Sequence, residues 1–295
     1  RSLGFKLLRV APRLLDFVKF MEQRHASYNT VPLALAWAKR PSHAQLATWA
    51  QRLSYVRIFA RYRNATDPRT QIPPAGLLPF RPRRARPYLY SDREIRELLR
   101  AALELPRRGL RPWTYYCLLG LLSVSGLRIG EAQNLQLQDI DLKARLLTIR
   151  GAKFGKDRLV PLHPSTCRVL ARYIARRQRL WARRSASPYL FLSTRGNRLD
   201  GGDIRRTFYA LSRKIGLRAA SDRCGPRLHD MRHRFASKTL LRWYQAGEDP
   251  ERRLPALSAY LGHVHWTDTY WYLSALPQLM REAMSRLESH WEQRP

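Results

Sequence analysis

The chain has 295 residues, enough for two ordinary domains, and 44% of them are hydrophobic, which excludes wholesale disorder. Lysine and arginine total 55 against 22 acidic residues, which gives a formal net charge of +33. Such an excess repels itself in a compact fold unless a polyanion neutralises it, so nucleic acid is favoured as a partner over a membrane surface. A solubility role or a general arginine bias is the competing interpretation.

Apolar runs and cysteines narrow the class of protein further. The longest apolar runs, such as Tyr115 to Val124, are far too short to span a bilayer. No basic-then-apolar leader opens the sequence, so we expect a cytoplasmic protein. The three cysteines, Cys117, Cys167 and Cys224, are widely spaced and form no CxxC pair. A disulfide framework or a structural zinc site is therefore not expected.

Helical periodicity dominates the beginning of the chain. Apolar residues recur at helical spacing from Leu14 to Met21 and from Leu46 to Phe59, and Thr30 stands at a plausible helix start. We expect a small domain of four or five helices over residues 1–72. Prolines and arginines then crowd together over residues 73–90, which predicts an extended basic linker whose arginines can follow a DNA backbone.

The second domain is expected over residues 91–295. Ser91 and Glu94 form the pattern of a capping box, and a long apolar helix over about 113–125 should end at Gly126. Further expected elements are two strands at 146–150 and 158–162 joined by a flexible hairpin tip, one more strand at 189–192, and helices over 165–184, 203–215, 229–245, 255–262 and 277–292. The fold class predicted is mainly α with a small antiparallel β-sheet.

Polar residues suited to holding a phosphate stand at the ends of these elements. Arg128 follows Gly126, and Glu131 three residues later can fix the orientation of its guanidinium. His229 and Arg232 are three residues apart, on one face of a predicted helix start. An isolated HxxR pattern also has many explanations that involve no functional site.

The order of the motifs is more specific than any one of them. Gly-Leu-Arg-Ile-Gly-Glu is followed by a lysine-bearing hairpin, then by His-x-x-Arg, and then by Leu-Gly-His with a tyrosine nine residues later. In these motifs the chain resembles the tyrosine recombinase (phage integrase) family. The resemblance covers the whole chain, with specific motifs in the second domain and a similar layout in the first. It implies a DNA-binding core-binding domain over residues 1–72 and a catalytic domain over 91–295.

The resemblance also implies a set of site residues. Two arginines would clamp the oxygens of one phosphate, and a tyrosine would become covalently joined to DNA. The implied catalytic residues are Arg128, Lys153, His229, Arg232, His263 and the nucleophile Tyr272, with Glu131 as the acidic partner of the first arginine. Lys153 resembles the hairpin lysine that protonates the departing 5′ oxygen. Lys156 is the alternative, because Ala152 and Phe154 depart from the G-K-x-x-K-x-R pattern of the family.

Two tyrosines compete for the role of nucleophile. Tyr270 and Tyr272 are two residues apart, so on a helix they point to different sides and only one can face the phosphate. The family spacing from His263 selects Tyr272 and leaves Tyr270 and Trp271 as packing residues. The competing interpretation is that Tyr272 is a core aromatic. The family often has a histidine two residues after the tyrosine, where this chain has Ser274.

The implied chemistry bears on cofactors and partners. Attack on a phosphodiester would give a 3′-phosphotyrosine and a free 5′ hydroxyl, which needs no ATP and, with this many cations, no metal or other cofactor. Cys224, His229 and His233 lack a fourth partner for zinc. The implied partners are double-stranded DNA with inverted-repeat sites and further copies of the chain in a tetramer. An amphipathic segment at 277–291 would dock on a neighbouring protomer or fold back on its own domain.

The leading hypothesis is therefore a site-specific recombinase for integration or transposition of a mobile element, associated with a bacterial nucleoid. A type IB topoisomerase shares the chemistry, but the domain-sized helical first module and the motif spacing disfavour it. A DNA-binding accessory protein without catalysis is a third hypothesis, and the complete set of site residues disfavours it.

Overall fold

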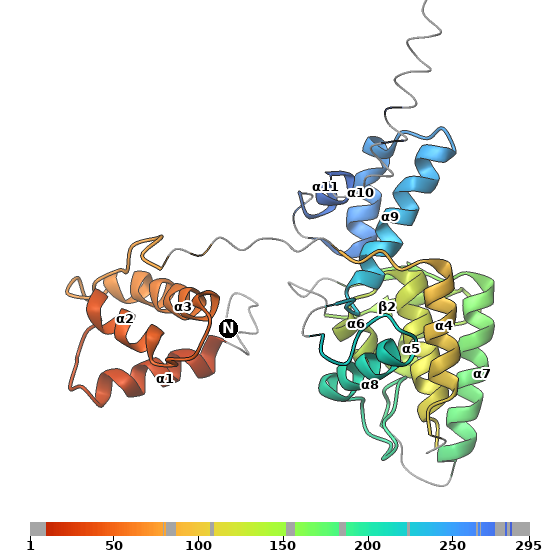
Figure 1. Ribbon diagram of the computed structural model, residues 1–295, viewed down its shortest axis with the longest axis horizontal. Coiled ribbons are helices and arrows are strands. Elements are labelled where there is room, and N and C mark those ends of the chain that lie inside the picture. The colour runs from red at the N-terminus through yellow and green to blue at the C-terminus, as the bar shows by residue number, and fades with distance from the viewer. Residues whose placement is uncertain are drawn as a thin grey trace, which may run out of the picture. The chain divides into compact units, whose positions relative to one another are not determined.

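The computed structural model describes residues 10–78, 80, 87–106, 109–151, 157–182, 187–222, 225–263, 265, 267–274, 281 and 284. The chain divides into two compact units, Arg1–Ala85 and Arg86–Pro295, and each has a hydrophobic core of its own (Figure 1). The described residues are mainly helical with one small antiparallel sheet, which confirms the predicted fold class. Within them, no helix combines the length and the apolar character that crossing a membrane requires.

The N-terminal unit is built from helices α1 (Val10–Glu22), α2 (Val31–Lys39) and α3 (Leu46–Asn64). Thr30 caps α2 as predicted, because its side chain accepts a hydrogen bond from the Leu33 amide. Phe17 and Trp37 pack edge to face in the core. The described part of this unit has three helices where four or five were predicted, because the segments between them are short turns and loops.

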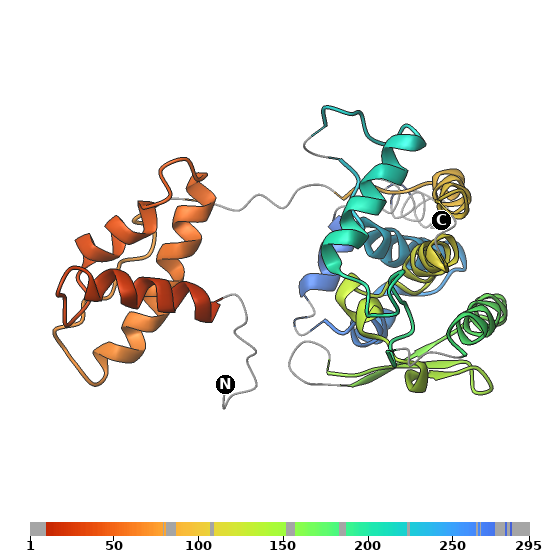
Figure 2. The same ribbon diagram turned by 90° about the horizontal axis from the view of Figure 1, so that it is seen from below.

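The C-terminal unit is organised around one buried helix. Its elements are α4 (Asp92–Leu103), α5 (Arg111–Ser125), α6 (Ile129–Asn134), the 3₁₀ turn η1 (Leu137–Asp139), β1 (Ile140–Asp141), β2 (Leu146–Ile149), β3 (Arg158–Pro161), α7 (Pro164–Trp181), α8 (Gly201–Lys214), α9 (Asp230–Gln245), α10 (Pro250–Leu261) and α11 (Thr267–Ser274). Helix α5 is the predicted apolar helix, and α4, α7 and α9 pack against it (Figures 1 and 2). It ends at Gly126, whose left-handed φ of +61° turns the chain towards α6.

The sheet is a three-stranded antiparallel ribbon in the order β1-β2-β3. In the β2–β3 pair Leu146 lies opposite Pro161 and Ile149 opposite Arg158, as the predicted hairpin requires. The strand predicted at 189–192 is wrong: only Tyr189 and Leu192 pair, each in an isolated bridge to a different segment, so no ladder forms. The tip of the hairpin, with Lys153 and Lys156, lies outside the described residues.

Helices α7 to α10 correspond to the four helices predicted between 165 and 262, with one corrected boundary. Helix α10 begins at Pro250 and not at 255, because Asp249 caps it by accepting hydrogen bonds from the amides of Glu251 and Arg252. Pro255 lies inside the helix. The helix predicted over 277–292 lies outside the described residues except for 281 and 284.

Candidate active site

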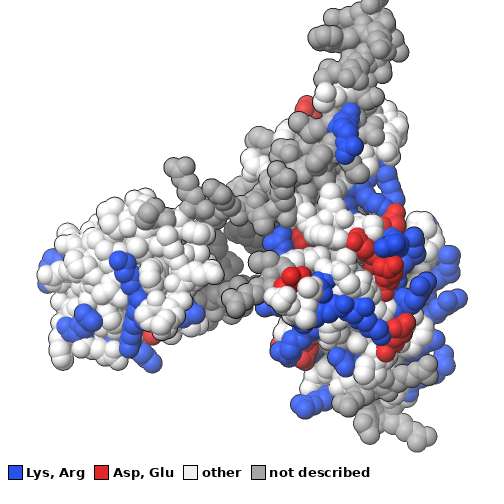
Figure 3. Space-filling view, in the orientation of Figure 1, with Lys and Arg blue, Asp and Glu red and all other residues white. Residues whose placement is uncertain are grey.

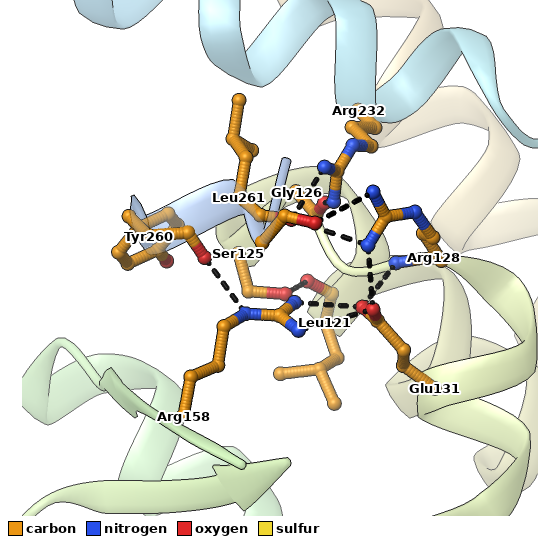
Figure 4. Close-up of polar contacts among 10 residues, drawn as sticks. Leu121, Ser125, Gly126, Arg128, Glu131, Arg158, Arg232, Tyr260 and Leu261 are labelled. Atoms are coloured by element: carbon orange, nitrogen blue, oxygen red, sulfur yellow. Dashed lines mark hydrogen bonds and ion pairs between the residues drawn. The ribbon is translucent and has the colours of Figure 1, made fainter. Parts of the chain in front are cut away.

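Five of the six catalytic residues predicted from the sequence lie where several element ends converge, and Figure 4 shows two of them, Arg128 and Arg232. The turn between α5 and α6 supplies Arg128, the start of α9 supplies His229 and Arg232, and the end of α10 with α11 supplies His263 and Tyr272. The sixth, Lys153, lies outside the described residues, as does its alternative Lys156.

The carbonyl groups at the C-terminal end of α10, residues 260–262, are shared by three arginines (Figure 4). Arg158 Nε donates to the first carbonyl at 2.8 Å, and Arg232 Nη2 donates to the second at 2.5 Å. Arg128 donates to the second and third, at 3.3 and 3.0 Å. The last carbonyls of a helix lack partners within it and carry the negative end of its dipole. They therefore attract and orient all three guanidinium groups.

Glu131 connects two of these arginines. Its Oε1 accepts from Arg128 Nη1 at 2.9 Å and from Arg158 Nη1 at 3.1 Å, while Oε2 accepts from Arg158 Nη2 at 2.8 Å. Burial alone would raise the pKa of Glu131, but the hydrogen bonds from Arg158 and Arg128 outweigh it and lower the pKa. Glu131 is thus held as a carboxylate and fixes the orientation of Arg128, as its position in the sequence predicted.

Arg232 is a buried cation, with 1% of its surface exposed. Its acceptors are the carbonyls of Leu261 and Gly126, the latter at 2.9 Å from Nη1, and among the described residues no carboxylate forms an ion pair with it. Burial, with the neighbouring charge of Arg128, lowers the pKa of Arg232 to about 10, so it stays protonated at neutral pH. A buried cation held only by carbonyl groups is well placed to bind an anion.

Tyr272 packs between histidines. Only 3% of it is exposed, and its ring centroid lies 5.4 Å from that of His233 and 6.2 Å from that of His263, with the latter rings nearly parallel. His233 in turn meets His229 edge to face at 4.8 Å. Tyr270 is 41% exposed, so the two tyrosines lie on different sides of α11 as predicted. The side chains of Trp271 and Ser274 are outside the described part of the chain.

The histidines beside Tyr272 are neutral at neutral pH. Burial lowers the pKa of His233 and of His263 to about 4, and the charge of Arg232 contributes to the lowering at His263. His263 Nδ1 lies 2.7 Å from Thr269 Oγ1, so its Nε2 is not engaged in this contact. Burial, with the charge of Arg232, also lowers the pKa of His229 to about 4, although this residue is exposed at the start of α9. The group therefore offers neutral hydrogen-bonding nitrogens and two fixed cations.

No catalytic or positioning role was predicted from the sequence for Arg158 or His233. Arg158 is the last residue of the G-K-x-x-K-x-R hairpin pattern, and His233 lies one helical turn after His229. These two positions are the only indications of a functional role that the sequence offers for Arg158 and His233. No group of three or more histidine, cysteine, aspartate or glutamate side chains suited to a metal ion occurs in the described part of the chain. Cys224, considered above as a zinc ligand, lies outside the described residues.

Residues 90–278 match the family model described as the phage integrase family. The chain belongs to the phage integrase, or tyrosine recombinase, family. This recombinase is 65% identical to the putative integrase/recombinase y4rB of Sinorhizobium fredii, over 100% of this chain and 95% of that protein. It is 33% identical to the tyrosine recombinase XerC of Pelotomaculum thermopropionicum, over 77% of this chain and 70% of that protein.

Solved structures share the recombinase fold at low sequence identity. The XerH site-specific recombinase bound to a palindromic difH substrate has a TM-score of 0.66 at 19% identity, covering 95% of this chain and 79% of that one. The Tn1549 transposon integrase in complex with transposon right end DNA has a TM-score of 0.62 at 18% identity, covering 95% of this chain and 94% of that one. The likeness to these two proteins is one of fold.

Proposed function

We propose that this recombinase cuts and rejoins DNA strands at specific sites of a mobile genetic element, through a covalent 3′-phosphotyrosine on Tyr272. The observation that carries the proposal is the convergence of Tyr272 with two neutral histidines and with Arg128 and Arg232, whose guanidinium groups are fixed at the end of α10. The net charge of +33 and the DNA complexes of the XerH and Tn1549 enzymes support DNA as the substrate.

The arginines account for binding and stabilising the phosphate. A guanidinium group has five N–H donors, and the described contacts engage three of them in Arg128 and two in Arg232. The remaining donors can bind the non-bridging oxygens of one phosphate and offset the negative charge that grows in the transition state. Since the protein fixes these groups before DNA arrives, little reorganisation is needed during the reaction.

The proposed cleavage step is a transesterification. The Tyr272 oxygen bonds to phosphorus, the bond from phosphorus to the 5′ oxygen breaks, and the phenolic proton passes to a neighbouring neutral histidine. Lys153 gives a proton to the departing 5′ oxygen. His229 and His263 hydrogen-bond the phosphate oxygens. Rejoining reverses the step with a 5′ hydroxyl from another strand, so the energy of the phosphodiester bond is retained in the tyrosine ester.

The remaining parts of the proposal concern assembly. Residues 1–72 and the basic linker 73–90 bind the duplex beside the cleavage site, and residues 91–295 carry out the chemistry. Four copies join two inverted-repeat sites, consistent with the palindromic substrate named for XerH and the dimer of lambda integrase on its core site. The protein would act at the bacterial nucleoid.

A covalent trapping experiment tests the nucleophile. The substrate is a nicked duplex carrying an inverted repeat from the DNA that flanks the coding region, so that cleavage releases a short fragment and cannot be reversed. We expect the wild-type chain to form an adduct on a denaturing gel and Tyr272→Phe to form none, while the matched control Tyr270→Phe retains it. An adduct with Tyr272→Phe, or none with the wild-type chain, would contradict the proposal.

A further inference from the structure

One face of α7 carries four arginines in a row. Arg168, Arg172, Arg176 and Arg179 follow one another along this helix, and at about 100° per residue they fall within an arc of about 80°. The first, second and fourth are exposed, and Arg176 is partly buried. We call these four residues the α7 arginine face. It lies opposite the side of the helix that packs into the core.

No carboxylate neutralises the α7 arginine face within the described residues. The segment 158–199 contains neither aspartate nor glutamate, and none of the four arginines forms an ion pair with a described residue. Other exposed arginines of the same unit, such as Arg206 and Arg253, each pair with a neighbouring carboxylate. Arg176 lies over the Trp113 ring at 4.0 Å, a contact that leaves its charge in place. The face thus gathers positive charge that a polyanion would offset.

The α7 arginine face is separate from the candidate active site. The described residues of that site come from the α5–α6 turn, α6, β3, α9, α10 and α11 and their ends, and none comes from α7. Helix α7 lies at the outer edge of the C-terminal unit in both ribbon views, and lysine and arginine side chains gather along that edge in Figure 3. A polyanion bound there would not be the phosphate that Tyr272 attacks.

The dimensions of the face suit a DNA strand. A rise of 1.5 Å per residue separates Arg168 from Arg179 by about 16 Å along the helix, and one strand of a duplex presents about five phosphates over that length. Guanidinium groups match phosphate oxygens in geometry as well as charge. An anionic membrane fits less well, because the apolar side of α7, with Leu170 and Tyr173, is buried in the core and cannot enter a bilayer.

We infer that the α7 arginine face is a second DNA-binding surface, which holds the backbone of duplex DNA outside the cleaved site. The inference rests on the proposed function for the choice of DNA as the polyanion. Contacts to phosphates alone carry no base information, so this binding is independent of sequence. It would add affinity for long DNA without affecting the chemistry at Tyr272.

The test uses the full chain with Arg168→Gln, Arg172→Gln and Arg179→Gln combined, and keeps Arg176 because it packs on Trp113. Affinity for a long duplex of unrelated sequence is measured over a series of salt concentrations. We expect the slope of log affinity against log salt to become less steep by up to about 2.7, since each phosphate contact contributes about 0.9. Adduct formation on a short nicked duplex limited to the cleavage site should match the wild-type rate.

Two matched variants complete the test. Arg206→Gln, Arg252→Gln and Arg253→Gln remove the same charge from arginines that have carboxylate partners, so we expect a smaller change of slope. Lysine in place of glutamine at the three α7 positions should keep the wild-type slope. An unchanged slope in the glutamine variant, or an equal change in the control, would overturn the inference. The proposed function fails separately, through loss of the adduct, because the slope is measured without cleavage.

Discussion

Arg158 links three elements at the scale of a single residue. It begins β3, binds both carboxylate oxygens of Glu131 and donates to the carbonyl of Tyr260 at the end of α10. The two side chains of the ion pair are 11% and 9% exposed, so water competes little with the contact. Because Glu131 also orients Arg128, Arg158 influences the position of Arg128, although no described bond joins the two arginines.

Replacing Arg158 should therefore weaken both the fold and the proposed reaction. Arg158→Ala leaves a buried carboxylate with one cationic partner in place of two, which should lower the free energy of unfolding by about 3 kcal/mol. The rate of adduct formation should fall as Arg128 loses its fixed orientation. Arg158→Lys should recover part of the stability and part of the rate, since lysine keeps the positive charge but lacks the planar set of N–H donors of a guanidinium group. Urea unfolding and single-turnover trapping measure the two effects.

Arg93→Ala provides the control for this prediction, because Arg93 is 80% exposed in its pair with Glu97. Its removal should change the free energy of unfolding by less than about 1 kcal/mol. If Arg158→Ala were as mild as Arg93→Ala in both measurements, Arg158 would not position the site.

Spacing along the sequence predicts only some of the contacts between site residues. The pairing of Arg128 with Glu131 and the separation of Tyr270 from Tyr272 follow from helical geometry, which acts over a few residues. The partners of Arg158 lie 27 and 102 residues away. Such contacts arise only when the chain folds, so no local pattern could indicate them. The catalytic roles themselves remain predictions from family resemblance.

At the scale of elements, two boundaries with a local cause were predicted correctly, whereas the start of α10 at its Asp249 cap was not. The capping box of Ser91 and Glu94 starts α4, and Gly126 ends α5 in a left-handed conformation. The strand predicted at 189–192 was wrong, because a strand needs a continuous partner and the sequence of a segment cannot specify one. The two-residue strand β1 was not predicted for the same reason, since it forms only by pairing with β2.

Gly262 fixes the geometry at the end of α10. Its φ is +65°, and a Cβ there would lie 2.9 Å from Arg158 Nη1. Gly247 has a φ of +77° with open space around it, so Gly247→Ala is a matched control. Both alanine variants should lose about 1 kcal/mol of stability from the left-handed backbone. Gly262→Ala should lose more and should also slow adduct formation, because it displaces Arg158.

Thermal unfolding and the trapping assay distinguish these two glycine variants. Equal melting temperatures and equal adduct rates for Gly262→Ala and Gly247→Ala would show that the α10 end tolerates displacement of the guanidinium. The prediction is specific to the contact with Arg158, since the backbone cost is common to both variants.

At the scale of the whole molecule, the buried histidines make stability depend on pH. The pKa of His233 and of His263 is about 4 in the folded chain, against an ordinary value of 6.5. Between these values the unfolded chain binds protons that the folded chain does not. The stabilisation from the neutral histidines is therefore complete above about pH 6.5 and is lost as the pH falls towards 4.

Melting temperature measured from pH 7.5 down to 4.5 checks this dependence. We expect a decline below pH 6.5 that is shallower in His233→Phe, which removes one titrating group and keeps an aromatic ring against Tyr272. His43→Gln, at an exposed position of the N-terminal unit, should leave the decline unchanged. A His233→Phe profile parallel to the wild type would indicate that other groups cause the decline.

The fold class was predictable for the whole molecule because helical periodicity recurs through both units, and each apolar stripe requires a core. Within the described residues of the N-terminal unit three helices are found where four or five were predicted, since composition sets the helical content of a segment more closely than it sets the number of turns within it.

The carbonyl groups that hold the three arginines belong to the main chain. Their oxygens are present whatever side chains occupy residues 260 and 261, so related chains can vary those side chains during evolution and keep the acceptors. At Gly262 the choice is narrower, because of its backbone angle and the nearby guanidinium. Sequence divergence at residues 260 and 261 is thus a poor guide to divergence of the site, because two such recombinases can differ at both positions and still share these acceptors.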